Sequence, residues 1–476
     1  MEGKNRFDGC VKKDVCPDIC LIFQDFLRGM VKNNAGFNKQ FIFLVSEWGR
    51  LYFVNGCNRM EIFSFLHVIH NEYSFYSVLS PADSENILVY DSMIDAWNSC
   101  VKVEGRTKVD KHMLKLNSLQ ALRAIAFLGI FIWHCGIDIG NTGAWGVSVF
   151  FVLSGFLMIY NYMPKGTEDF EKLRLVKWNI YDSVCFSIRK ILKLWPVHLL
   201  MLILLVILSA HGLLNETFDI MIWIKWSGNL LLDIFLLQSW VPIESVYYSF
   251  NGVAWFLSVS VFLYSIFPLI LKRISVYQKV VDGIYAILLI LIIQVIVAWM
   301  TTYISVDISK WVTYICPLYR AGDFIIGCNL GYIFLKKQNA IQSGKIWTLA
   351  EVFVIGIVLL QFLAAIKLEE HNVIWLRYTL VFTLGSMGLV YLFAINQGFV
   401  SKFLTNKLLL YIGNISGEAF LIHQIIIGQV VGRTHKFLGY NPTMLYIFIV
   451  SFAITIFMVY IIDVCRLKWH VLRRIG

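Results

Sequence analysis

Charged residues are scarce in this sequence. Asp, Glu, Lys and Arg make up 15% of its 476 residues, whereas hydrophobic residues make up 58%. A soluble globular domain has about 25% charged residues, so this scarcity excludes a soluble, a disordered or a fibrous protein. The composition is typical of a membrane protein, for which lipid is the solvent around most of the chain.

Two other missing features exclude further classes. The ten cysteines are spread along the chain without the pattern of a disulfide framework, and Cys16 and Cys20 lack the second Cys/His pair of a zinc site. We therefore expect no metal. The first residues also lack the apolar segment of a signal peptide.

The excess of positive charge does not indicate a nucleic-acid partner. Residues 1–117 contain 14 basic and 14 acidic residues, so the net charge of +10 comes entirely from the apolar remainder. There it can act as a topology signal, because cytoplasmic loops of membrane proteins are enriched in Lys and Arg. We therefore expect membrane lipid, and no nucleic acid, as the partner of this apolar part.

The N-terminal part, residues 1–115, differs in kind from the rest. It is mixed and charged and has no apolar run of spanning length, which predicts a small mixed α/β domain in the cytosol with no assigned role. Two apolar runs, 41–45 and 51–54, flank Gly49 and predict a β-hairpin. Residues 86–90 predict another short strand.

Residues 116–476 predict an integral membrane domain. Apolar runs of spanning length recur there, so we expect a mainly α-helical, polytopic membrane bundle of about ten spans. An eleventh apolar stretch, residues 219–238, is interrupted by Lys225, Asn229 and Asp233. The ten predicted spans are residues 121–138, 144–162, 192–209, 252–270, 283–301, 313–335, 347–366, 373–395, 408–431 and 443–463.

The distribution of basic residues decides how the eleventh stretch is interpreted. If the N-terminal domain is cytosolic and residues 219–238 are re-entrant or interfacial, the segments facing the cytosol contain 19 Lys and Arg, and the opposite loops contain four. If residues 219–238 cross, every later basic loop changes side. The positive-inside rule favours the first arrangement. It predicts a multi-pass protein of the cell membrane with both termini cytoplasmic.

Arg123 and His134 are the first candidates for a site inside the membrane. They are eleven residues apart, which on a helix is three turns plus about 20°, so both side chains lie on one face and differ in depth by about 16 Å. His423 and His134 each lie roughly 20 Å from the cytosolic ends of their spans, and Glu418 precedes His423 by about one and a half turns. Two imidazoles and an acid in one layer are what proton transfer requires.

Six segments stand in a fixed order along the membrane part. They are 119–126 (LQALRAIA) with the following Trp133 and His134, 146–156 (GVSVFFVLSGF), 189–196 (RKILKLWP), 238–240 (QSW) with 251–258 (NGVAWFLS), 320–327 (RAGDFIIG), and 411–416 (YIGNIS) with 420–424 (FLIHQ). Together, over about residues 117–463, they resemble the acyltransferase-3 family of integral membrane O-acyltransferases, whose opening helix has an Arg, ten residues and a His. The N-terminal domain lies outside the resemblance.

The resemblance implies an enzyme that transfers an acyl group, usually acetyl, from cytosolic acyl-CoA to a hydroxyl, commonly on an extracytoplasmic glycan. Acyl-CoA, usually acetyl-CoA, would be the co-substrate. His134 would be the general base that deprotonates the acceptor hydroxyl, or a transient carrier of the acyl group. Glu418 and His423 would orient the acceptor or the base, and Arg123 would contact the donor as it enters.

Arg189 and Lys193, one turn apart before Pro196, are expected to bind CoA phosphates at the cytosolic mouth of the third span. Ordinary positive-inside topology is the competing interpretation of these charges. For Trp255, a wall of the substrate pocket and a buried structural role are equally compatible with the sequence. On the same motifs, the further substrate-binding candidates are Asn251, Trp255, Ser258, Arg320 and Asp323.

The sequence departs from the family pattern at two points. Ser260 stands where many members have Glu, so a role that depends on that acid would need another residue, such as Glu418. Lys193 stands where Arg is usual, which keeps the charge but loses the bidentate fork. The sequence also contains no Gly-Asp-Ser block of the esterase-like domain that is fused to some members.

Two other functional classes stay open. A proton-coupled transporter or flippase of a glycan or lipid precursor would also need ionisable groups within spans, although no internal repeat relates the two halves of this chain. A catalytically silent receptor with a sensory N-terminal domain would not need Arg123 and His134 on one helix face. Consumption of acyl-CoA separates the enzyme from a transporter. The sequence leaves a homo-oligomer open.

Overall fold

The computed structural model describes residues 40–45, 51–56, 60–64, 116–163, 180–214, 219–439 and 441–475. The chain divides into two compact units, residues 1–98 with 465–476 and residues 99–464. Each unit is described by itself. The predicted boundary at residue 115 stays a prediction.

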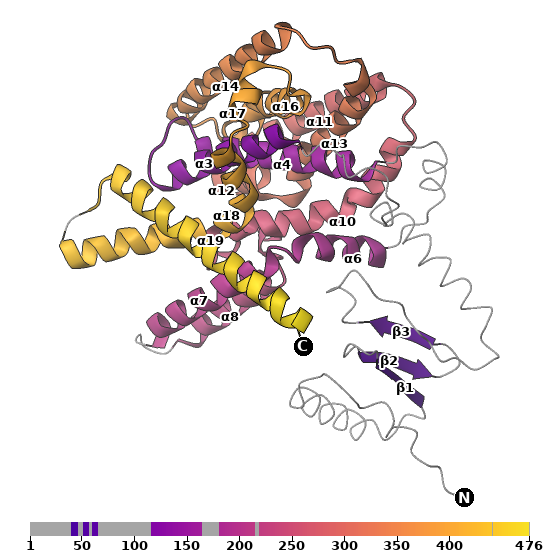
Figure 1. Ribbon diagram of the computed structural model, residues 1–476. Coiled ribbons are helices and arrows are strands. Elements are labelled where there is room, and N and C mark those ends of the chain that lie inside the picture. The colour runs from indigo at the N-terminus through magenta and orange to yellow at the C-terminus, as the bar shows by residue number, and fades with distance from the viewer. Residues whose placement is uncertain are drawn as a thin grey trace, which may run out of the picture. The chain divides into compact units, whose positions relative to one another are not determined.

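The first unit contains a three-stranded antiparallel sheet in the order β1-β2-β3. Strand β1 (Gln40–Val45) pairs with β2 (Leu51–Gly56), and Val45 lies opposite Leu51 (Figure 1). This pairing confirms the predicted β-hairpin. Strand β3 (Met60–Ser64), which the sequence analysis did not predict, pairs with β2. The predicted strand at residues 86–90 lies outside the described residues.

The second unit is a helix bundle, as predicted. Seven of its described helices are long and apolar enough to cross a membrane, and the bent pair α6 (Ile180–Ile191) and α7 (Trp195–Leu214) makes an eighth if the two form one span. The axes of this pair meet at 71°. The seven helices lie in α4 (Thr142–Tyr162), α10 (Trp255–Ser275), α11 (Val280–Met300), α14 (Ile346–Glu370), α16 (Leu380–Ile395) with the preceding α15 (Ile374–Arg377), α18 (Lys407–Leu438) and α19 (Met444–Ile475).

Two predicted spans fall on helices that are less apolar. They are α3 (Asn117–His134) and α13 (Pro317–Lys337), which carry Arg123 and the Arg320–Asp323 pair. Both helices are largely buried in the bundle, where other helices shield them from lipid. The structure therefore has several helices that can span a membrane, whereas the total of ten spans stays a prediction.

Glycines let the central helices approach one another closely. A Cβ atom added at Gly146 of α4 would lie 2.5 Å from the carbonyl oxygen of Ala126 in α3, and one added at Gly413 of α18 would lie 2.1 Å from the carbonyl oxygen of Gln120 in α3. Backbone contacts through small residues are typical of helix packing in membranes. They fix α3 between α4 and α18, and so determine where the side chains of α3 point.

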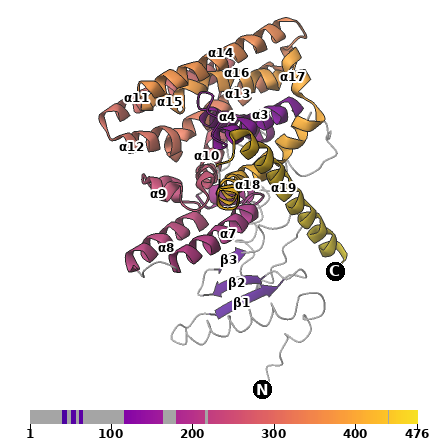
Figure 2. The ribbon, with the colours of Figure 1, turned by 90° about the vertical axis from the view of Figure 1, so that its left-hand side faces the viewer.

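Helix α8 (Ile220–Ile234) returns alongside α7 as the second arm of a helical hairpin, as Figures 1 and 2 show. The indole N–H of Trp226 donates to the Ser209 hydroxyl at 3.1 Å, and the His198 ring lies 3.0 Å from the carbonyl oxygen of Asp233. With 15 residues, α8 is shorter than the roughly 20 that a span needs. The Asp233 end of α8 thus lies beside the start of α7, and the expectation that residues 219–238 do not cross stays a prediction.

The chain then returns to the bundle through short elements. Glu244, at the start of α9, forms an ion pair of 2.7 Å with Lys310 at the end of α12, which follows α11. The segment after α8 and the connection between α11 and α13 therefore lie on one side of the bundle. The short elements are η1 (Gln238–Trp240), α9 (Glu244–Tyr247), η2 (Gly252–Ala254), η3 (Thr301–Tyr303), α12 (Val306–Lys310), the π-helical turn η4 (Trp311–Ile315), η5 (Gln338–Ala340) and α17 (Phe399–Leu404).

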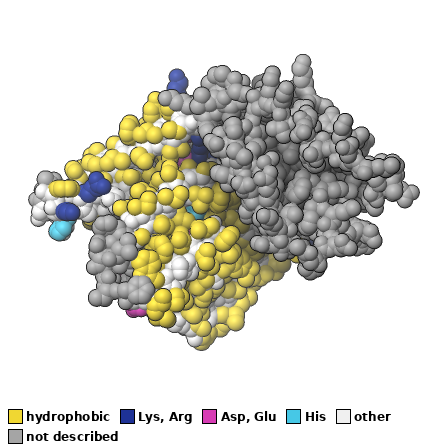
Figure 3. Space-filling view, turned by 90° about the horizontal axis from the view of Figure 1, so that it is seen from below, with side chains coloured by type: hydrophobic (Ala, Val, Ile, Leu, Met, Phe, Trp, Pro, Cys, Tyr) yellow, Lys and Arg dark blue, Asp and Glu magenta, His cyan; other side chains and the backbone are white. Residues whose placement is uncertain are grey.

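Large apolar side chains cover the outside of the bundle. Leu289 of α11, Phe353 of α14 and Phe457 of α19 are each more than half exposed. Figure 3 shows one such face, on which hydrophobic side chains cover most of the described surface and Lys and Arg side chains lie mainly at its edges. This is the surface that a lipid environment requires.

Candidate active site

The structure brings the two intramembrane histidines together. His134 is the last residue of α3, and His423 lies in the middle of α18. Nε2 of His423 lies 3.2 Å from Nδ1 of His134, and the two rings meet edge to face with their centroids 4.8 Å apart. The similar depth that the sequence predicted is thus a direct contact.

The hydrogen bonds of the pair determine where its protons are. Nδ1 of His423 lies 2.7 Å from the carbonyl oxygen of Phe420, and Nδ1 of His134 lies 2.9 Å from that of Ile130. A carbonyl oxygen only accepts, so both Nδ1 atoms carry a proton when the rings are neutral. Nε2 of His423 then accepts from Nδ1–H of His134. This arrangement leaves the lone pair of His134 Nε2 available as a base.

Aromatic rings surround His423, the inner histidine of the pair. His423 is fully buried, and the rings of Phe127, Phe131 and Phe420 lie 5.8, 5.6 and 5.7 Å from its own. Because these neighbours are apolar, the imidazole of His134 and the carbonyl of Phe420 fix the orientation of the His423 ring. His134 itself is only partly buried, which suits a residue that must meet a substrate.

A second polar layer lies nearer the start of α3. Nearly buried Glu418 of α18 lies 3.5 Å from the ammonium of exposed Lys193, in the turn between α6 and α7. Arg123 of α3 interacts electrostatically with Tyr264 of α10 and with Glu418. The Tyr264 hydroxyl lies 3.1 Å from that of Ser154 in α4. Arg123, Glu418 and Lys193, assigned separately from the sequence, thus belong to one cluster.

Arg189 and Lys193, the basic residues before Pro196, lie at the end of a helix, α6, and in the turn that follows it. Helix α6, which the sequence analysis did not predict, runs along α10 and donates a 2.6 Å hydrogen bond from Ser187 to the carbonyl oxygen of Val261. Arg189 is exposed near the end of α6. Arg189 and Lys193 therefore lie beside the first half of α10, and Lys193 is close to Glu418. The regular spacing of apolar residues in 180–191 is the signal that would have indicated α6.

Two predicted substrate-binding residues hold the segment after α8 against the bundle. Nδ2 of Asn251 donates to the carbonyl oxygen of Leu421 at 2.8 Å, two residues before His423. The Ser258 hydroxyl donates to the carbonyl oxygen of Leu236 at 2.6 Å. Within the described part of the chain, the buried Oδ1 of Asn251 has no hydrogen-bond partner. Gln424, which the sequence analysis did not select, packs directly on Gly252 and shares this property at its Oε1.

Trp255 connects the histidine layer to a buried ion pair. Its ring lies 5.1 Å from Tyr314, and the following residue, Phe256, lies 5.3 Å from Phe420. Tyr314 in turn lies 5.0 Å from the guanidinium of Arg320. Both interpretations of Trp255, as a pocket wall and as a structural residue, stay open because the ring is buried among aromatic neighbours.

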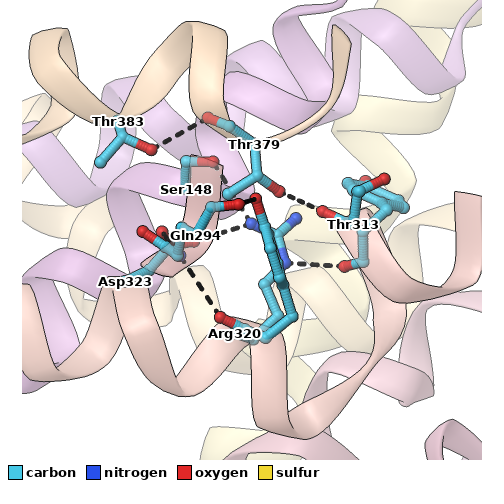
Figure 4. A network of polar contacts seen from close by, with 9 residues as sticks. Ser148, Gln294, Thr313, Arg320, Asp323, Thr379 and Thr383 are labelled. Carbon is cyan, nitrogen blue, oxygen red and sulfur yellow. Dashed lines mark hydrogen bonds and ion pairs between the residues drawn. The ribbon is translucent and has the colours of Figure 1, made fainter. Parts of the chain in front are cut away.

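Arg320 and Asp323 form a fully buried ion pair of 2.8 Å one turn apart on α13 (Figure 4). Nε2 of Gln294 donates to Asp323 at 3.2 Å, and Nε of Arg320 donates to the carbonyl oxygen of Tyr314 at 2.7 Å. A buried ion pair with such partners fixes the packing of its helix, since removal of one charge leaves the other uncompensated. Their predicted role in substrate binding stays a prediction.

Among the residues that the structure describes, no cluster of three or more His, Cys, Asp or Glu side chains could hold a metal ion.

Comparison with known proteins gives a family. The model of an acyltransferase domain matches residues 116–463. A Staphylococcus aureus (strain COL) protein named "putative O-acetyltransferase" is 24% identical over 375 residues, which cover 75% of this chain and 57% of the relative. The O-acetyltransferase OatA of Staphylococcus aureus (strain NCTC 8325 / PS 47) is 24% identical over 354 residues, 72% of this chain and 55% of the relative. The chain thus matches just over half the length of these relatives. No solved structure matches it.

Proposed function

The chain belongs to the acyltransferase-3 family of membrane O-acyltransferases, and from this premise we propose that it transfers an acyl group from acyl-CoA to a hydroxyl. The observation that carries the proposal is the His134–His423 contact of 3.2 Å, which provides a base inside the membrane bundle. The matched relatives are named O-acetyltransferases, which favours acetyl as the group and acetyl-CoA as the donor.

The chemistry follows from the proton positions in the pair. Nε2 of His134 takes the proton of the acceptor hydroxyl as the hydroxyl oxygen attacks the thioester carbonyl. The C–O bond forms, the C–S bond breaks, and the proton passes from the imidazolium to the departing thiolate of CoA. Throughout, Nδ1–H of His134 stays bonded to Ile130 and His423, which stabilises the imidazolium. A transient acyl group on Nε2 would use the same lone pair.

The second polar layer suits the donor. CoA carries phosphates, and Lys193 and Arg189 are exposed cations beside the same stretch of α10. Arg123 lies three turns of α3 before His134, so it would meet the donor between the phosphate-binding residues and the base. Glu418 holds Lys193 and interacts with Arg123, and it would keep the two cations apart in a fixed arrangement.

A glycan hydroxyl is the acceptor that we propose. The unpartnered carbonyl oxygen of the Asn251 amide lies on the segment that is anchored two residues before His423. Amide oxygens accept hydrogen bonds from hydroxyls, so this group would hold a second hydroxyl of the acceptor while a first one reaches His134. Ser258, Trp255, Arg320 and Asp323 would support this segment from α10 and α13.

The test is acetyl-CoA consumption by the purified protein, measured as released thiol. We expect His134→Ala and His134→Gln to lose about 10²–10⁴-fold in rate, because removal of a general base has that effect and glutamine accepts no proton near pH 7. His435→Ala, an exposed histidine on the same helix as His423, is the matched control and should keep the wild-type rate. Transfer by His134→Ala at the wild-type rate would refute the mechanism. A wild-type protein that never consumes acetyl-CoA would favour a transporter.

A further inference from the structure

A groove of about 750 Å³ lies between the second half of α10, the first half of α11 and the face of α13 beneath them. Its volume is within the range of about 300–1,000 Å³ that is typical of small-molecule sites. Along α10 it begins at Leu269, 13 residues or about 20 Å beyond Phe256, which contacts the histidine layer. It is therefore separate from the proposed active site.

The walls of the groove are apolar and open toward lipid. Leu269, Leu289 and Tyr285 line it and are 57%, 59% and 67% exposed. The small side chain of Ala286 leaves the groove wide at this point. A hydrocarbon chain is the occupant that such walls favour, because burial of apolar surface is favourable and no water needs to enter.

The end of the groove near the α10–α11 connection is charged. Arg273 lines it and is exposed, and its guanidinium lies 6.0 Å from the Tyr277 ring. Asp282 also lines it, but its carboxylate already accepts 2.8 Å hydrogen bonds from the backbone N–H groups of Gln278 and Lys279 at the start of α11. In the described part of the chain Arg273 has no ion pair, so its positive charge, unlike the hydrogen-bonded Asp282 carboxylate, is available to a ligand.

The floor contains an unpartnered polar atom. Asn329 of α13 lines the groove and is 1% exposed. Its Nδ2 donates to the carbonyl oxygen of Ile325 at 2.8 Å, whereas its buried Oδ1 has no partner among the described residues. A buried acceptor without a partner is costly, and a hydroxyl from a ligand would satisfy it.

We propose that this groove binds one anionic glycerophospholipid whose headgroup carries hydroxyls. Its phosphate lies on Arg273, a headgroup hydroxyl donates to Oδ1 of Asn329, and one acyl chain lies between α10 and α11. Basic pockets between membrane helices bind anionic lipid headgroups in this way. Phosphatidylglycerol has both the charge and the hydroxyls, and phosphatidylcholine with the same acyl chains lacks both the net charge and the hydroxyls.

The experiment measures lipid retention by the full chain. Purified protein is delipidated in mild detergent, exposed to either lipid, and examined by native mass spectrometry. We expect phosphatidylglycerol to be retained and phosphatidylcholine not. Arg273→Gln should weaken retention about tenfold, the effect of one lost charge-assisted contact. Lys337→Gln, an exposed cation at the end of α13 and outside the groove, is the control.

Two further variants test where the acyl chain lies and whether the headgroup hydroxyl contacts Asn329. Ala286→Trp should fill the groove and abolish retention, whereas Val295→Trp, exposed on α11 outside the groove, should leave it unchanged. Asn329→Leu should weaken phosphatidylglycerol retention without unfolding the protein, as a melting curve would verify. Equal retention of the two lipids, or retention that survives both Arg273→Gln and Ala286→Trp, would overturn the proposal.

Discussion

At the scale of single residues, the reactive atom depends on its neighbours. His134 alone has two ring nitrogens that can carry the proton, and nothing in its sequence context selects one of them. Ile130 and His423 select Nδ1 as the protonated nitrogen, at 2.9 and 3.2 Å. His423 is therefore a positioning residue, because it acts on the substrate only through His134.

Substitutions of His423 should separate positioning from catalysis. Glutamine at this position can still accept a hydrogen bond from Nδ1–H of His134, whereas leucine cannot. We expect His423→Leu to lower kcat about 10–100-fold, the value of a hydrogen bond to a group that becomes charged, and His423→Gln to recover much of that loss. Thiol release at saturating acetyl-CoA measures both. Equal activity of the two variants would show that the accepting atom has no role.

Arg189 should affect the donor and leave the base intact. It is exposed near the end of α6, and a phosphate contact through a guanidinium is charge-assisted. We expect Arg189→Ala to weaken acetyl-CoA binding by about 1.5–3 kcal/mol, seen as a higher KM, with kcat nearly unchanged. Lys345→Ala, a basic residue in a different loop, is the control. An unaltered affinity for acetyl-CoA in Arg189→Ala would remove this residue from the donor site.

At the scale of elements, α8 carries a buried carboxyl, that of Asp233, near its end. Burial raises the pKa of the Asp233 carboxyl from 3.8 to about 7, against the lowering effect of the hydrogen bond that Ser249 donates to it. The folded state thus prefers the neutral acid. Since the folded pKa lies above the unfolded one, the stability from this group is fully present below about pH 4 and is lost as the pH rises through about 7.

Asp233→Asn should remove this dependence, because the amide is neutral at every pH. We expect the variant to melt a few degrees above the wild type at pH 8 and close to it at pH 5. Asp219→Asn, an exposed acid at the start of the same helix, should leave the pH dependence unchanged. Thermal melts in detergent at the two pH values measure this. A wild-type protein with the same melting temperature at pH 5 and pH 8 would contradict the assignment.

The elements also show how far the sequence alone could lead. Apolar runs predicted where the helices lie, because the lipid requires long apolar segments whatever their neighbours. They did not predict α6, since 12 residues are too few to span, or the 71° bend that brings Lys193 to Glu418. Counting 1.5 Å per residue placed His134 and His423 at one depth. Their contact also needs the rotation of α3, which the backbone approach at Gly413 determines.

At the scale of the whole molecule, one ion pair and two cations bear on how the chain crosses the membrane. Glu244 pairs with Lys310 at 2.7 Å, so the segment after α8 lies on the side of the α11–α13 connection. Lys272 and Arg273 lie at the other end of α10. If α8 does not cross, these two cations are cytoplasmic, as the positive-inside rule requires, and both termini are cytoplasmic too.

Cysteine labelling on intact cells tests this topology. The ten native cysteines are replaced, and single cysteines are introduced at the exposed positions Ile220, Ile243 and Gln278. We expect an impermeant maleimide to label Ile220→Cys and Ile243→Cys from outside, because the distribution of basic residues predicts that residues 219–238 do not cross. Gln278→Cys should react only after permeabilisation, since η2 and α10 together form a span of 24 residues from Gly252 to Ser275. Opposite accessibility at positions 220 and 243 would mean that α8 crosses, and every later loop would then change side.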